Sequence, residues 1–295
     1  MNILVTGAAG RLGRRVCREL MDQGHTVRGT DITVNPKSPV RIDVQNILDR
    51  EVCYRLCEGM EVVIHLANHT NEHYGTPQKV YGENMVMNMN VFQAAVDCGV
   101  KKLLFASSIQ AISGRRPLSE TIPSEIPYFP IDGDMPGNPG NPYALSKVHA
   151  ESLLRHFAKM QKISTIAIRY PGLVGNLARM AMYNDGSSIV EWSRIHGTTG
   201  DEAFVFLTHK EAARFTRICV EKELPGYNCF LPAFREPYLY KRTVSDLKTQ
   251  FYPSVPWRNE CGENPTFANL AVLQEKLGWS PPAFDITETD DSLGW

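Results

Sequence analysis

The stretch "NILVTGAAGRLGRRVCREL", residues 2–20, predicts a short apolar strand, a glycine-rich turn and an amphipathic helix with Val16, Leu20 and Met21 on one face. Further strands and helices are expected to alternate along the chain. The strands are predicted near 26–31, 40–44, 61–67, 102–108 and 164–170, and the helices near 49–58, 79–98 and from 142. Apolar strands separated by helices indicate a parallel sheet that is covered on both faces. The expected fold class is α/β, with a doubly wound parallel sheet.

The glycine-rich turn lies where such a sheet binds phosphate, between the first strand and its helix. Gly7 would permit a tight turn, Gly10 would let the backbone approach a pyrophosphate, and Gly13 would let the helix pack closely on the strand. A plain structural turn is the alternative, but the position favours a dinucleotide. Asp31 would accept hydrogen bonds from ribose hydroxyls and repel a 2′-phosphate, which favours NAD over NADP. Arg28 and Arg11 are close enough in sequence to leave that preference open.

A tyrosine and a lysine stand one helical turn apart in "NPYALSKVHAESLL", residues 141–154. Tyr143 and Lys147 can therefore point at the same small volume beside the helix. An ammonium near a phenol lowers the phenol pKa from about 10, so Tyr143 could act as a general acid or base. A solvated pair on an exposed helix face is the alternative for this motif taken alone.

Together these motifs resemble the extended short-chain dehydrogenase/reductases, the NAD-dependent epimerase/dehydratase family, over nearly the whole chain. The resemblance also rests on "RIDV" (41–44), "HLAN" (65–68), the stretch 83–108 that ends in Ser108, and "IRYPGLVG" (168–175). It implies a Rossmann core for NAD over residues 1–170. Residues 171–295 are expected to form a small substrate-binding lobe, with some segments returning to the core.

The resemblance also implies roles for individual residues. Tyr143 would be the acid/base, Ser108 would position the substrate oxygen, and Lys147 would hold the tyrosinate and the nicotinamide ribose. Ser108 could instead cap the turn after its strand, and Ser107 is the less favoured catalyst. The residues expected to bind NAD are Gly7, Gly10, Arg11, Leu12, Gly13, Asp31, Asp43, Val44, Leu66, Ala67, Asn84, Tyr143, Lys147, Tyr170 and Pro171.

The expected function is an NAD-dependent oxidoreductase that moves hydride between NAD and a small hydroxylated, sugar-like substrate. An epimerase with tightly bound NAD is the alternative, and an NAD sensor would not need the Ser, Tyr and Lys set. Dehydration is not expected, because Ile109 and Gln110 replace the Asp-Glu pair of the family's dehydratases. The short segment 174–203 favours a small substrate over a nucleotide sugar. The residues expected to contact substrate are Asn68, His69, Gln110, Asn176 and Arg179, with Arg179 gripping a carboxylate such as that of a uronic acid.

Bulk properties exclude several other partners. The net charge of -1 and 21% charged residues give no basic field for nucleic acid or a membrane surface. The chain has no recognisable targeting segment or long apolar run, so a cytoplasmic location is expected. His65, His69 and His73 recur every four residues but cannot share one helix if His65 lies in a strand, so no metal is expected. The remaining partners are a small-molecule substrate and, as an open option, a second copy in a homodimer.

Overall fold

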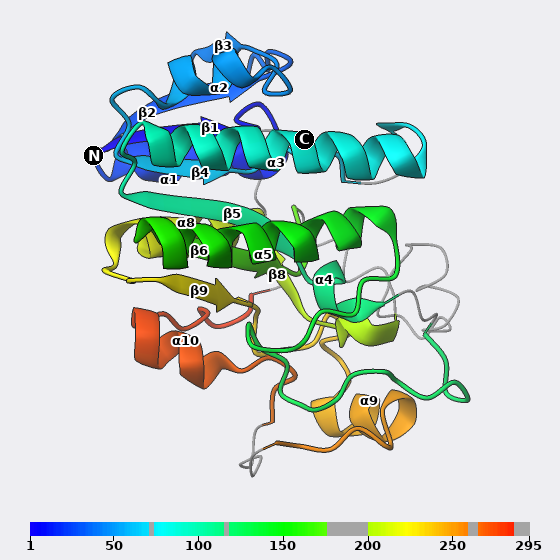
Figure 1. The fold of residues 1–295 in the computed structure, drawn as a ribbon. Coiled ribbons are helices and arrows are strands. Elements are labelled where there is room, and N and C mark those ends of the chain that lie inside the picture. The colour runs from blue at the N-terminus through cyan, green and yellow to red at the C-terminus, as the bar shows by residue number, and fades with distance from the viewer. Residues whose placement is uncertain (71–73, 115–117, 176–199, 259–264, 286–295) are drawn as a thin grey trace.

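The computed structural model describes residues 1–70, 74–114, 118–175, 200–258 and 265–285. A seven-stranded parallel sheet in the order β3-β2-β1-β4-β5-β6-β9 forms its centre (Figure 1). Its strands are β1 (Asn2–Thr6), β2 (Thr26–Asp31), β3 (Ile42–Val44), β4 (Val62–His65), β5 (Lys102–Ser108), β6 (Ser164–Tyr170) and β9 (Tyr227–Phe230). A second sheet pairs β7 (Gly172–Val174) with β8 (Phe206–Thr208). The strand order reverses between β1 and β4, so the doubly wound α/β prediction is confirmed.

Helices cover both faces of the large sheet. The helices of the described residues are α1 (Arg11–Asp22), α2 (Arg50–Cys57), α3 (Pro77–Asp97), α4 (Gln110–Ser113), α5 (Pro142–Gln161), α8 (His209–Glu221), α9 (Val244–Phe251) and α10 (Leu270–Leu277), with a short 3-10 turn η2 (Gly200–Glu202). On one face α3 packs between α2 and α5, and on the other α1 packs against α8. A separate hydrophobic cluster fills each interface. None of the helices in the described ranges combines the length and apolar character needed to cross a membrane.

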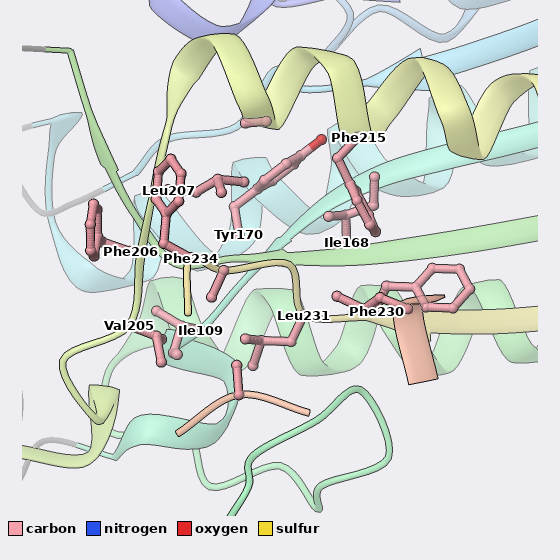
Figure 2. Packing of buried hydrophobic residues seen from close by; sticks show 14 of the residues in the cluster. Ile109, Ile168, Tyr170, Val205, Phe206, Leu207, Phe215, Phe230, Leu231 and Phe234 are labelled. Carbon is pink, nitrogen blue, oxygen red and sulfur yellow. The ribbon is translucent and has the colours of Figure 1, made fainter. Parts of the chain in front are cut away.

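The C-terminal part contributes directly to the large sheet. The sequence predicts a loss of strand–helix alternation after residue 170, but β8, α8 and β9 continue it, and β9 pairs with β6. Figure 2 shows why this packing is stable: Phe215 of α8 packs beside Ile168 and Tyr170 of β6, and Phe230 of β9 lies in the same cluster. Burying these side chains covers the face of β6 that would otherwise meet water. The division into 1–170 and 171–295 stays a prediction.

Two helix expectations need correction. Val16 and Leu20 are fully buried on α1, whereas Met21 is 39% exposed. Each residue turns a helix by about 100°, so Met21 cannot share the inward face of its neighbour Leu20. The sequence also predicts a last helix over 267–277 that ends at Gly278. The helix α10 begins instead at Leu270, and it ends as expected at Gly278, whose φ of 67° is left-handed.

Candidate active site

A cavity of about 880 Å³ opens at the C-terminal ends of β1, β2, β4 and β5. This volume lies within the range of about 300–1,000 Å³ that is usual for small-molecule sites. Most of the predicted site residues line it, although they come from distant parts of the chain. They are Gly7, Gly10, Arg11, Leu12, Gly13, Asp31, Leu66, Ala67, Asn68, His69, Ser108, Tyr143, Lys147, Tyr170 and Pro171.

The glycine turn brings the start of α1 close to the sheet. Gly7 has a φ of +72°, and a Cβ on it would lie 2.9 Å from the backbone nitrogen of Ala67. A Cβ on Gly13 would lie only 2.1 Å from the carbonyl oxygen of Gly7, so helix and turn could not approach as they do. Gly10 begins α1 without a side-chain cap among the described residues. The helix therefore presents its positive end to the cavity, as an anion-binding site requires.

Asp31 ends β2 at the rim of the same cavity. One of its oxygens accepts a hydrogen bond from the Ala9 backbone at 3.1 Å, and the other accepts one from Ile32 at 2.7 Å. The carboxylate is thus fixed beside the glycine turn. Arg28 does not line the cavity, because its guanidinium donates to the Arg55 and Leu56 carbonyls and to Asp43.

Asp43 and Val44, the pair expected to contact adenine, do not line the cavity. Hydrogen bonds from Gln45 and Arg28 lower the pKa of Asp43 despite some burial, and Val44 is 52% exposed. Gln45 and Ile47, which follow β3, line the cavity instead. The motif therefore identifies the correct strand, β3, but the residues that line the cavity are those that follow this strand.

The start of α5 sets the position of the tyrosine and the lysine. Asn141 caps the helix by accepting a hydrogen bond from the Ala144 backbone at 2.8 Å, and Pro142 occupies the first helical turn. Tyr143 and Lys147 follow on the cavity side. The Lys147 ammonium lies 5.2 Å from the centre of the Tyr143 ring.

The expected lowering of the Tyr143 pKa is wrong for the protein alone. Burial raises the pKa of Tyr143 to about 12, against a lowering contribution from a hydrogen bond with Ser108 and a further raising one from Glu202. Burial also lowers the pKa of Lys147 to about 7, opposed by the charge of Glu151. Desolvation is therefore the largest cause of both pKa shifts. Burial disfavours the phenolate of Tyr143 and the ammonium of Lys147. Such pKa shifts are typical of functional sites, in which a bound ligand can supply the opposite charge.

The two serines at the end of β5 have different partners. Ser107 donates a hydrogen bond to Glu151 at 2.7 Å, which commits its hydroxyl to the interior. Glu151 forms a buried, two-pronged ion pair with Arg169, with distances of 2.9 and 2.8 Å. Ser108 accepts a hydrogen bond from the Gln110 backbone at 3.2 Å, so it does cap its turn, but it also interacts with the Tyr143 phenol.

Three other predicted site residues form hydrogen bonds to protein groups around the cavity. Asn84 is fully buried outside the cavity lining and joins the His69 backbone to Ser146 of α5. Gln110 accepts a hydrogen bond from Asn141 at 3.0 Å and does not line the cavity either. Tyr170 lines it, but its hydroxyl bonds to Thr216 of α8 on the other side.

His69, a predicted substrate residue, lines the cavity and contacts the side chain of Glu83. Its Nε2 lies 2.6 Å from Glu83, and its ring packs on Tyr74 with centroids 5.0 Å apart. Asn176 and Arg179 lie outside the described residues, as does His73, the third of the regularly spaced histidines. Within the described ranges, His, Cys, Asp and Glu side chains form no group that could hold a metal.

Sequence reasoning missed the residues behind Lys147. Its ammonium donates to Asn68 Oδ1 at 2.8 Å, and Asn68 in turn bonds to Asn88, which bonds to His65. A strand histidine and a helix asparagine carry no motif of their own. The only signal in the sequence is their polarity within apolar surroundings, "VVIHLAN" and "NMVMNMNVF".

Comparisons with known proteins agree with this geometry. The model of the NAD dependent epimerase/dehydratase family matches residues 3–196. A uronate dehydrogenase of Pseudomonas putida is 28% identical over 172 residues, 57% of this chain and 59% of the relative. A UDP-glucose 4-epimerase of Lactobacillus helveticus is 30% identical over 186 residues, 59% of this chain and 52% of the relative. The matched part thus spans between half and three fifths of the length of each of these relatives.

Solved structures share the fold over the whole chain. The UDP-glucose 4-epimerase of Thermotoga maritima, solved with UDP-glucose, superposes with a TM-score of 0.72 at 21% identity and covers 99% of this chain and 97% of its own. The UDP-glucose 4-epimerase of Brucella ovis, solved with NAD, has a TM-score of 0.70 at 20% identity and covers 99% and 96%. Since the family model matches most of the sequence, the chain belongs to the NAD dependent epimerase/dehydratase family.

Proposed function

We propose that this protein is an NAD-dependent oxidoreductase that transfers hydride between NAD and a small hydroxylated, sugar-like substrate. The observation that carries the proposal is the convergence of Ser108, Tyr143 and Lys147 on the cavity that the glycine turn and Asp31 also line. Each element has another explanation when taken alone. A phosphate-binding turn and a proton-transfer group in one cavity are the two halves of a dehydrogenase site.

The described residues fit a dinucleotide. Gly7 and Gly13 let the turn pack closely against the end of β4 and the first turn of α1, and the uncapped start of α1 lines the cavity, so this turn would hold the pyrophosphate. Asp31 would bind the adenosine ribose, and the third N–H of Lys147 would bind the nicotinamide ribose. When bound, NAD supplies the hydride acceptor and a positive charge beside the phenol.

Tyr143 would carry the proton. In the direction of oxidation its phenolate takes the proton of the substrate hydroxyl, while Ser108 donates a hydrogen bond to the same oxygen. The raised pKa of Tyr143 means that the protein alone holds the neutral phenol near pH 7. The cationic ring and the Lys147 ammonium both favour the phenolate, so proton transfer would be coupled to formation of the complex.

The substrate class follows from polarity and size. Asn68 and Gln110 are engaged by Lys147 and Asn141, so His69 with its partner Glu83 is the described residue best placed to meet substrate hydroxyls. Arg179 remains our candidate for binding a carboxylate, and the likeness to a uronate dehydrogenase supports an acidic sugar. Replacing Arg179 by Ala should raise KM for acidic substrates alone. Equal effects on neutral ones would remove this candidate.

An epimerase with tightly bound NAD is the second candidate. It is favoured by the likeness to UDP-glucose 4-epimerases in fold over 99% of the chain. Ser108, Tyr143 and Lys147 would serve both reactions. The difference lies in whether NADH leaves or returns its hydride.

We also propose a homodimer. Val86 and Met89 of α3 and Leu145 of α5 are 46%, 41% and 37% exposed on two helices that pack together. Burying such a face against a second copy would remove apolar surface from water. Light scattering of the purified protein checks this, and a monomer at micromolar concentration would contradict it.

A panel of aldoses, uronic acids, lactols and nucleotide sugars, followed by NADH absorbance and by chromatography of the products, tests the catalytic proposal. We expect NADH to form with at least one small hydroxylated member of the panel. Isomer formation without NADH would favour the epimerase. NAD binding without either reaction would contradict both candidates.

A further inference from the structure

The environment of Lys147 is built around a side-chain amide. Its ammonium is buried, with 2% of the residue exposed, and donates to Asn68 Oδ1 at 2.8 Å and to the Ala106 carbonyl at 2.7 Å. A lysine ammonium has three donors, so one remains for a ligand in the cavity. Asn68 lies directly after β4, on the segment that leads to α3, and lines the cavity beside Lys147.

The amide of Asn68 has only one productive orientation. Its Nδ2 donates to the Ala67 carbonyl at 2.7 Å and to Asn88 Oδ1 at 3.0 Å. If the amide were turned over, its oxygen would face these two acceptors and its NH₂ would face the ammonium, so all contacts would be lost. Asn68 therefore presents its oxygen to Lys147, since its nitrogen donates to Ala67 and Asn88.

Asn68 orients the oxygen of Asn88 toward itself, and Asn88 in turn selects the tautomer of a neutral histidine, His65. Burial, and then the charge of Lys147, lower the pKa of His65 to about 3, so the ring is neutral with one donor and one acceptor. Its Nδ1 lies 2.7 Å from Thr6 Oγ1 and its Nε2 lies 3.0 Å from Asn88 Oδ1. Asn88 Oδ1 accepts from Asn68 and can only accept from His65 as well. His65 thus carries its proton on Nε2 and accepts the Thr6 hydrogen on Nδ1.

These hydrogen bonds converge on Asn88 Oδ1, which accepts from His65 on one side and from Asn68 on the other, so that Asn68 keeps its own oxygen as an acceptor for Lys147. We infer that Asn68 is a positioning residue for Lys147, held by Asn88 and His65, which fixes the ammonium at the cavity wall and stabilises its charged form. The inference rests on the proposed function for the role of Lys147. The local series also explains why a histidine and an asparagine are fully buried inside two apolar elements.

The charged form matters because burial works against it. Desolvation lowers the pKa of Lys147 to about 7, and Glu151, one helical turn further along α5, opposes this shift. Glu151 is shared with Arg169, while His65 and Tyr143 near the ammonium are neutral. Asn68 therefore supplies a direct acceptor for Lys147, whereas the Glu151 carboxylate is already paired with Arg169. Without it, Lys147 would lose its proton at a lower pH.

The test measures Lys147 itself. The protein is labelled with ¹³Cε-lysine, and the resonance of Lys147 is assigned by its loss in Lys147→Arg. In Asn68→Asp, which replaces the amide by a carboxylate of the same shape, the titration midpoint of Lys147 should rise by about one to three pH units. In Asn68→Ala it should fall by about one pH unit, the effect of losing a hydrogen bond to a charged group. Asn228→Ala on β9, where the amide bonds to the Leu224 and Pro225 carbonyls, is the matched control and should keep the parent midpoint.

An unchanged midpoint in both Asn68 variants would overturn the inference. If Asn68→Ala does not fold, Asn68→Asp still decides, because it preserves volume and reverses the expected shift. The measurement needs no turnover, so it can succeed even if the proposed reaction is wrong. Where turnover is found, the pH above which kcat falls should move up in Asn68→Asp and down in Asn68→Ala. Equal losses of kcat at all pH values would mean a merely structural role.

Discussion

His65 should make the stability of the protein depend steeply on pH. The ring has no exposed surface, and its pKa is lowered from 6.5 to about 3, mainly by burial and further by the charge of Lys147. In the unfolded chain the ring takes up a proton below its ordinary pKa of about 6.5, whereas in the folded protein it stays neutral down to about pH 3. The unfolded state therefore binds more protons, and stability is lost as the pH falls between these values.

The expected size follows from linkage. At pH 5, protonation of His65 stabilises the unfolded state by about 1.4 kcal/mol for each of the roughly 1.5 pH units below the ordinary pKa of the ring. The free energy of unfolding should thus be about 2 kcal/mol smaller at pH 5 than at pH 7 because of His65 alone. His65→Gln keeps a donor for Asn88 but cannot titrate. It should lower stability at pH 7 and lose about 2 kcal/mol less than the parent on going to pH 5.

Urea unfolding followed by tryptophan fluorescence at pH 7 and pH 5 measures this difference. The control is His156→Gln, which removes an exposed histidine of α5 and should leave the full pH dependence of the parent. The opposite result is an equal loss of the free energy of unfolding in the parent and in His65→Gln between the two pH values. It would then follow that His65 is not held neutral in the folded protein.

Three further predictions concern the site. Tyr143→Phe should reduce turnover by about 10² to 10⁴ and leave NAD affinity almost unchanged, since only the transferable proton is lost. Lys147→Ala should reduce both turnover and NAD affinity. A near-normal kcat in Tyr143→Phe would exclude Tyr143 as the acid/base. Asp31→Ala should narrow the preference for NAD over NADP by about 1–3 kcal/mol in binding titrations, and a parent protein that binds NADP at least as tightly would contradict the role of Asp31. Glu151→Ala should lower the free energy of urea unfolding by about 3–5 kcal/mol, because it leaves Arg169 buried without its carboxylate. A loss comparable to that of an exposed ion pair, about 1 kcal/mol or less, would show that Arg169 finds another partner.

The fold was largely predictable because its signals are local and repeated. The predicted strands 26–31, 102–108 and 164–170 coincide with β2, β5 and β6, where apolar runs end at polar or turn residues. Some segments of the C-terminal part were expected to return to the core, but the strand that does so, β9, was not predictable, since "YNCF" is short and carries no motif. Its place is decided by packing of α8 and β9 on β6, which only the assembled chain reveals.

The site was predictable where chemistry demands a residue type at a fixed spacing. Gly7, Gly13, Tyr143 and Lys147 all line one cavity although they are distant in sequence. Asn84 was expected at the cofactor, but an asparagine motif cannot show which of its neighbours the amide will bond. The pKa of Tyr143 is raised and not lowered as predicted, because the spacing to Lys147 indicates a nearby charge but not the burial that opposes its effect.

In the proposed oxidation, hydride leaves the substrate and stays on the cofactor. A substrate found in the panel, carrying deuterium on the carbon that bears the reacting hydroxyl, tests this claim. We predict that one deuterium appears in NADH for each substrate molecule oxidised, and that Tyr143→Phe slows this transfer together with product formation. Deuterium that returns to an isomerised sugar, with no labelled NADH released, would contradict the claim and establish the epimerase instead.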